Sequence, residues 1–341
     1  MVEILKLLKP YRSVSIIGMS KNVGKTTTLN HILKEARGKL FLGLTSIGRD
    51  GEELDRVTAT EKPKIYIEKG TTIATAKYCL LNSDFTREII STTGIHTPMG
   101  EIVICKALSD GYVDLGGPSI NSYMKHIKDE LLKLNCNLVI IDGALSRKTF
   151  AAPQVCEGTV LATGAALSRS MTAVIKETKH TLDLLSLPQE QNTQTIKAAT
   201  KIIDEGIVGI INKDGTYKIV EVLTALDASK EIVEALDEEV SHVVIRGAVS
   251  DKLLEGVMTS TNLYKNITFI VEDGTKLFIS RETLYKFLKQ GGTIKVLGKI
   301  TVVCITANPK SPHGHEFPKE KFLEELREAV NIPVFDVVGG E

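Results

Sequence analysis

Short apolar runs alternate with helical patterns along most of this chain, and the alternation constrains its fold more than any other feature. Many of the runs are continuously apolar, which is typical of strands covered on both faces. The expected strands are residues 13–17, 40–44, 102–107, 138–141, 159–162, 207–211, 243–245, 267–271 and 300–305. Helical spacing marks residues 27–36, 119–134, 168–185, 228–238, 251–258, 280–290 and 319–330. Strands that alternate with helices predict an α/β fold with a largely parallel sheet flanked by helices.

Two breaks divide the chain. Residues 187–195 are polar and without periodicity, and a glycine pair interrupts the pattern at residues 290–293. The stretch between them repeats a smaller strand and helix alternation and has no phosphate-binding signal. We therefore expect a main domain formed by residues 1–190 and 298–341, with an inserted smaller α/β domain over residues 191–297 as a candidate platform for a partner.

Charge, cysteine content and hydropathy limit the partners and the cellular compartment that we expect. Lys+Arg and Asp+Glu both number 42, so no overall field favours nucleic acid or a membrane surface. The five cysteines are far apart and lack metal-site spacing, as expected for reduced thiols. No run reaches the roughly 20 apolar residues that span a bilayer. We expect a cytoplasmic protein that binds neither nucleic acid nor membranes.

The loop between the first expected strand and helix has the composition of a phosphate-binding loop. Gly24-Lys25-Thr26 matches the core of the Walker A pattern, although five residues instead of four separate Gly18 from Gly24. Backbone N–H groups at a helix start can surround phosphates, Lys25 can supply positive charge, and the Thr26 hydroxyl can ligate magnesium. The alternative is a chance tripeptide, against which the flanking strand and helix argue.

Two aspartates are candidates for the metal site that such a loop requires. Asp142 follows four apolar residues at the end of an expected strand, where a magnesium-binding carboxylate is needed. Its alternative is a simple Asp-Gly turn with Gly143. Asp50 follows the second expected strand, and a surface turn explains it equally well. The predicted catalytic set is Lys25, Asp50 and Asp142, and the predicted magnesium ligands are Thr26, Asp50 and Asp142.

The six-step glycine spacing resembles a particular group of nucleotide-binding loops. Gly18-x-Ser20-x-x-Val23-Gly24-Lys25-Thr26-Thr27 is similar to the loop of dethiobiotin synthetase and the cobyrinic-acid amidating synthetases, within the SIMIBI class of P-loop NTPases. The resemblance implies ATP and Mg²⁺ as ligands. It assigns nucleotide binding to Gly18, Ser20, Asn22, Val23, Gly24, Lys25, Thr26 and Thr27.

The C-terminal part extends the resemblance. In dethiobiotin synthetase-like proteins an asparagine after a late strand, and a proline-containing segment after the next helix, surround the adenine. By this resemblance Asn308 reads the base, and Pro333 to Asp336 flank it. The alternative for Asn308-Pro309 is the start of a turn.

Three functions stay open from the sequence. The Lys-Pro substrate pair of the dethiobiotin enzyme is missing from residues 41–48, and no cysteine lies in a glutaminase-type setting. Residues 8–27 and 43–52 are instead similar to reactivase subunits of lysine 5,6-aminomutase, and the similarity spans most of the chain. This resemblance implies ATP-driven exchange of damaged cobalamin, with the aminomutase and a second ATPase subunit as partners. The alternatives are an ATP-dependent small-molecule ligase and a slow nucleotide-dependent switch or scaffold. The oligomeric state is open, a dimer included.

Overall fold

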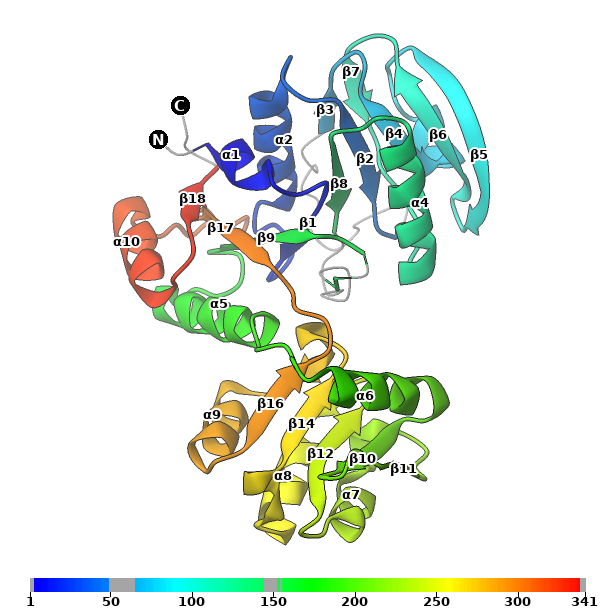
Figure 1. The fold of residues 1–341 in the computed structure, drawn as a ribbon. Coiled ribbons are helices and arrows are strands. Elements are labelled where there is room, and N and C mark those ends of the chain that lie inside the picture. The colour runs from blue at the N-terminus through cyan, green and yellow to red at the C-terminus, as the bar shows by residue number, and fades with distance from the viewer. Residues whose placement is uncertain (1–2, 49–64, 144–151, 154, 338–341) are drawn as a thin grey trace. The chain divides into compact units, whose positions relative to one another are not determined.

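The computed structural model describes residues 3–48, 65–143, 152, 153 and 155–337. These residues form two compact units, one of residues 1–179 and 301–341 and the other of residues 180–300. Each unit is an α/β structure built around its own sheet, and Figure 1 draws both.

The strands and helices of unit 1 come from both ends of the chain. Its strands are β1 (Ser13–Gly18), β2 (Leu42–Ser46), β3 (Ile65–Ile67), β4 (Thr72–Ala76), β5 (Arg87–Thr97), β6 (Gly100–Ala107), β7 (Gly111–Val113), β8 (Leu138–Asp142), β9 (Gly158–Gly164), β17 (Val302–Asn308) and β18 (Val334–Asp336). Its helices are α1 (Ile4–Leu8), α2 (Lys25–Ala36), α3 (Lys77–Leu81), α4 (Asn121–Lys133), α5 (Met171–Leu185) and α10 (Lys319–Ala329), of which α5 runs past the boundary of the unit.

Among the described residues of unit 1, nine strands form one sheet in the order β18-β17-β9-β1-β8-β2-β4-β6-β5. The neighbours from β18 to β4 are all parallel, and β6 is antiparallel to both β4 and β5. The prediction of a largely parallel α/β sheet flanked by helices is therefore confirmed. The long antiparallel β5 was not predicted, because most of its side chains are exposed and its Ser, Thr and Gly residues give no apolar run.

Alternate residues along the parallel strands supply two apolar layers. Val14, Ile16 and Ile140 pack with α1 and α2 on one face, whereas Val139 and Ile141 pack with α4 on the other. Burial on both faces explains why these strands read as continuous apolar runs.

Unit 2 has a smaller mixed sheet with the order β11-β10-β12-β14-β16. Its strands are β10 (Val208–Asn212), β11 (Tyr217–Val220), β12 (Val240–Ile245), β13 (Val249–Ser250), β14 (Thr268–Val271), β15 (Leu277–Phe278) and β16 (Thr293–Val296). Its helices are α6 (Thr193–Glu205), α7 (Ser229–Ala235), α8 (Asp251–Ser260) and α9 (Arg281–Lys289). Strands β12, β14 and β16 are parallel, and β10 is antiparallel to both β11 and β12.

The segment expected to be a linker, residues 187–195, belongs to unit 2. Gln189 forms a parallel bridge with Val296, and the Glu190 N–H donates to the Val296 carbonyl at 2.9 Å. Asn192 then caps α6, accepting from the N–H groups of Gln194 and Thr195. The polar composition of this stretch therefore reflects a strand-edge contact followed by a helix cap. The boundaries between the units fall after residues 179 and 300. The sequence analysis placed them after residues 190 and 297.

Candidate functional site

The carboxyl ends of four neighbouring parallel strands bring the predicted site residues to one edge of the unit 1 sheet. In register, Ile16 lies beside Asp142, Gly18 beside Ala162, and Gly164 beside Asn308. The loops that follow β1, β8, β9 and β17 therefore share this edge, which is where ligands bind in open α/β sheets.

The loop between β1 and α2 contains two residues in the left-handed backbone region. Asn22 and Gly24 have positive φ values of 59° and 97°. Val23 between them is buried and anchors the loop, and the Met19 N–H donates to the Ala162 carbonyl at 2.9 Å. Backbone that alternates between left- and right-handed conformations turns successive N–H groups toward one point. Gly24 precedes α2 without a side-chain cap, so the helix start presents its N–H groups and positive dipole end to this edge.

Lys25 is the first residue of α2, and its side chain lies back across the end of β1. Its Nζ donates to the Ser20 carbonyl at 3.2 Å. A β-carbon at Gly18 would lie 2.9 Å from this Nζ and equally close to two carbons of the side chain. The absence of a β-carbon at Gly18 thus lets the lysine side chain lie in this position.

The threonines that follow Lys25 have different environments. Thr26 and Thr27 are partly exposed in the first turn of α2. Thr28 is buried, donates through Oγ1 to the Gly24 carbonyl at 3.0 Å, and lies 2.8 Å from Thr306 Oγ1 of β17. The Thr28–Thr306 contact, which the sequence analysis missed, anchors the start of the helix to the sheet.

Asp142 is the last residue of β8, directly beside β1. Its main chain closes the strand end, since the Ile47 N–H donates to its carbonyl at 3.0 Å. Gly143 donates to the Ile16 carbonyl at 2.9 Å, and a β-carbon there would lie 2.5 Å from that oxygen. The tight turn thus requires Gly143, while Asp142 carries its carboxylate, with Oδ1 shielded from solvent, at the same sheet edge as the loop.

Asn308 ends β17 next to Gly24 of the loop between β1 and α2. A β-carbon on Gly24 would lie 3.5 Å from Asn308 Cβ and 3.7 Å from its Nδ2. The Lys310 N–H donates to Asn308 Oδ1 at 2.9 Å, so the residue also forms the turn that was its alternative interpretation. Turn formation engages the amide oxygen and places the amide nitrogen beside the loop.

Pro333 lies beside the same strand. The Ile305 N–H donates to the Pro333 carbonyl at 2.9 Å, and Asp336 then pairs in register with Ala307. The Lys319 ammonium contacts Asp336 at 2.6 Å, and this hydrogen bond raises the pKa of Lys319 above its ordinary value. Asp336 is therefore tied to α10.

Asp50 lies outside the described residues. In the segment of residues 313–316, His315 Nε2 contacts the Ala165 carbonyl at 2.9 Å, so this histidine fastens its loop to the end of β9. Within the described part of the chain, no group of three or more His, Cys, Asp or Glu side chains could hold a metal ion, and no helix is long and apolar enough to cross a membrane.

A glycine segment at residues 115–118 crosses the same sheet edge. A β-carbon on Gly117 would lie 1.9 Å from the Ser46 carbonyl at the end of β2, and Gly116 accepts from the Ala76 N–H at 2.8 Å. The close approach gives both glycines a structural reason. The pattern Leu115-Gly-Gly-Pro could have indicated such an approach of two backbones.

Comparisons with known proteins return no relative for this chain: no family model, no curated protein and no solved structure matches it.

Proposed function

We propose that unit 1 binds MgATP at the carboxyl edge of its sheet and hydrolyses it. The observation that carries the proposal is the convergence of the left-handed Gly24, the Lys25 ammonium and the Asp142 carboxylate at adjacent strand ends. The residues fit the ligand, since an uncapped helix start supplies N–H groups for phosphate oxygens.

Each residue has a defined role in this proposal. The Lys25 ammonium exchanges its weak contact with the Ser20 carbonyl for the β- and γ-phosphate oxygens, where a charge-assisted hydrogen bond is stronger. Thr26 and Asp142 hold magnesium, which neutralises charge on the phosphates. The loop amides and Lys25 stabilise charge that develops on the transferred phosphoryl group.

The adenine assignment rests on the sequence resemblance, and the position of the Asn308 amide supports it. Its Oδ1 is engaged by the Lys310 N–H, so its Nδ2 is the group that can donate to a ring nitrogen of the base. Pro333, which follows the neighbouring α10, flanks the same position in the proposal.

Calorimetric titration of ATP tests the nucleotide site. Lys25→Ala is expected to weaken ATP binding about a hundredfold, because a charged hydrogen-bonding group is lost from the phosphates. Lys34→Ala, in the last turn of the same helix, serves as the matched control and should bind ATP as the wild type does. Equal ATP affinity in the two variants would contradict the proposal.

We further propose that hydrolysis remodels a partner enzyme, with an adenosylcobalamin-dependent aminomutase as the candidate that the sequence resemblance suggests. Unit 2 is the candidate platform for this partner because it has its own apolar core and carries none of the residues of the proposed nucleotide site. Affinity capture with a slowly hydrolysed ATP analogue, followed by mass spectrometry, tests this role. Recovery of an aminomutase supports reactivation, whereas ADP release stimulated by a metabolite, with no protein recovered, supports the ligase alternative.

A further inference from the structure

A cavity in unit 1 lies at the opposite end of α2 from the loop of residues 18–24. It encloses about 550 Å³ between the end of α2, the start of β2, and strands β3 and β7. This volume is in the range of small-molecule sites. Because α2 has 12 residues, its two ends are about 18 Å apart, so the cavity is separate from the proposed nucleotide site.

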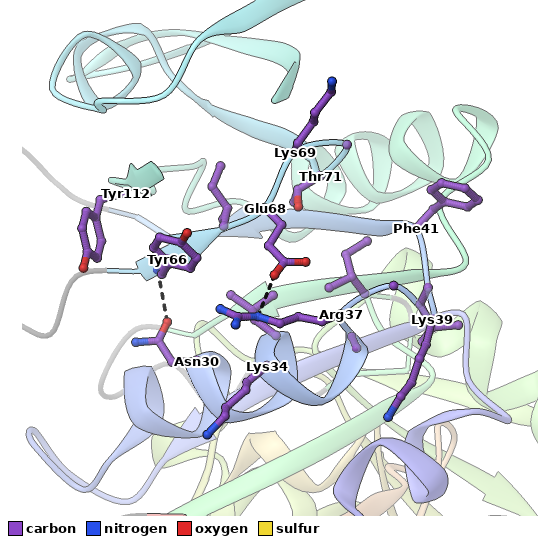
Figure 2. A pocket seen from close by; sticks show the side chains of 17 residues that line it. Asn30, Lys34, Arg37, Lys39, Phe41, Tyr66, Glu68, Lys69, Thr71 and Tyr112 are labelled. Carbon is purple, nitrogen blue, oxygen red and sulfur yellow. Dashed lines mark hydrogen bonds and ion pairs between the residues drawn. The ribbon is translucent and has the colours of Figure 1, made fainter. Parts of the chain in front are cut away.

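The wall of this cavity combines aromatic rings with an apolar floor. Tyr66 and Tyr112 meet edge to face with ring centroids 5.4 Å apart, and Phe41 lines the far side with 68% of its surface exposed. Figure 2 shows the two tyrosines at one end and Phe41 at the other. Buried Leu42 and Ile67 also line the cavity. Such a wall suits a flat apolar body.

The guanidinium of Arg37 is held at this wall with donors to spare. Its Nε pairs with Glu68 at 2.7 Å, and its Cζ lies 5.5 Å from the centre of the Tyr66 ring. Among the described residues, no other carboxylate lies within ion-pair distance of Arg37. The Nε of the guanidinium is thus paired with Glu68, and its face lies over the Tyr66 ring. The two terminal amino groups can form a two-point contact with an anion.

The rim adds positive charge. Lys34, Lys39 and Lys69 line the cavity, and Figure 2 shows their ammonium groups directed outward from it. Within the part of the chain that the structure describes, none of the three ammonium groups has a carboxylate partner. Four cationic side chains line the cavity with one carboxylate, Glu68. A second carboxylate, Asp110, accepts from the Tyr66 hydroxyl at 3.2 Å and from the Lys69 N–H at 2.8 Å. Four positive and two negative charges leave a net charge of +2, which attracts an anion.

We propose that this cavity binds a small amphipathic anion, with its apolar or aromatic body between Phe41 and the tyrosines and its acidic group on Arg37. The three rim lysines raise the local concentration of the anion without contacting it. The inference does not depend on the nucleotide site, because none of these residues belongs to the carboxyl edge of the sheet.

Fluorescence titration with 8-anilinonaphthalene-1-sulfonate tests the cavity, and the uncharged N-phenyl-1-naphthylamine serves as the probe that lacks the acidic group. Arg37→Gln is expected to weaken binding of the sulfonate about tenfold, because a charged hydrogen bond is lost. The uncharged probe should bind this variant and the wild type alike. Arg12→Gln is the matched control, since Arg12 is an exposed arginine of the same unit outside the cavity.

Phe41→Ala keeps the test independent of the Arg37–Glu68 pair, whose loss can affect folding. Phe41 is mostly exposed, so its removal should leave the thermal unfolding midpoint unchanged while both probes bind about fivefold more weakly. Phe278→Ala, which removes a similarly exposed ring in unit 2, is the control. Sulfonate binding that is equal in Arg37→Gln and Arg12→Gln, or in Phe41→Ala and Phe278→Ala, overturns the proposal.

Discussion

Both units have parallel strands whose carboxyl ends meet at one sheet edge, but the two edges carry opposite chemistry. In unit 1, β1 leads into a loop with left-handed residues and an uncapped helix, with Lys25 lying across it. In unit 2, the Glu272 carboxylate that follows β14 accepts from the Gly247 N–H at 2.8 Å and contacts Lys276 at 3.5 Å. In unit 2, the Glu272 side chain therefore accepts from a backbone N–H at the sheet edge. In unit 1, no side chain caps the N–H groups at the start of α2.

The comparison shows that the two sheet edges differ in the groups at their strand ends rather than in the sheet itself. Gly247 has a positive φ of 91°, much like Gly24. The left-handed glycine is thus common to both edges. The helix start and the lysine distinguish them.

The largest expected effect comes from replacing the carboxylate at the sheet edge of unit 1, with the carboxylate at the edge of unit 2 as the comparison. Asp142→Asn should lower the rate of ATP hydrolysis about a hundredfold at saturating ATP, because a magnesium ligand at the developing charge is lost. Glu272→Gln changes the corresponding carboxylate of unit 2 and should hydrolyse ATP at the wild-type rate. Steady-state phosphate release measures both variants, and equal rates in the two would break the comparison.

Glycine substitutions test whether the two units unfold independently of each other. A β-carbon on Gly164 would lie 2.3 Å from the Asn308 carbonyl, and one on Gly274 would lie 2.1 Å from the Leu184 carbonyl. Gly164→Ala and Gly274→Ala should each lower the free energy of unfolding by about 2 kcal/mol, through steric overlap with backbone. Amide hydrogen exchange resolved by peptide should show the loss in unit 1 for the first variant and in unit 2 for the second. Uniform loss across both units in either variant argues against independent units.

A smaller, pH-dependent effect is expected in unit 2. Burial lowers the pKa of His242 below its ordinary value of 6.5, with the neighbouring Glu190 carboxylate opposing the shift and Lys295 adding to it. The unfolded chain therefore takes up this proton at higher pH than the folded unit does. The stability contribution is fully present above about pH 6.5 and is lost as the pH falls through the folded value, by at most about 1.4 kcal/mol per pH unit.

His242→Gln removes this titration. The unfolding free energy of unit 2, followed by hydrogen exchange, should then depend less on pH below 6.5 than it does in the wild type. A pH dependence that is identical in the two proteins would show that His242 is not buried in its neutral form.

The smallest effect concerns the base. Asn308→Ala should weaken ATP binding only about fivefold, since a single neutral hydrogen bond to the adenine is lost. GTP binding, measured by the same calorimetric titration, should change less, so the ratio of the two affinities falls. An unchanged ratio would remove Asn308 from base recognition and leave it as a turn residue.

The sequence predicts best what local patterns determine. The apolar strands around Gly18 and Asp142 and the helix after Gly24 have strong local signals, and these strands are present in the fold. The adjacency of β8 to β1 is a matter of strand order, which no local pattern encodes. The helix α6 was missed because its polar start resembled a linker, although Asn192 is a good helix cap. The passage of the Lys25 side chain over Gly18 is a three-dimensional contact that no local sequence pattern encodes.

Hydrogen exchange of the wild-type protein with and without a slowly hydrolysed MgATP analogue tests the central claim most directly. The account predicts slower exchange at the amides of residues 19–28, which surround the proposed phosphates, and unchanged exchange at residues 246–248 and 272–276 of unit 2. Unchanged exchange at residues 19–28 under saturating nucleotide, or protection centred on the unit 2 edge, would contradict it.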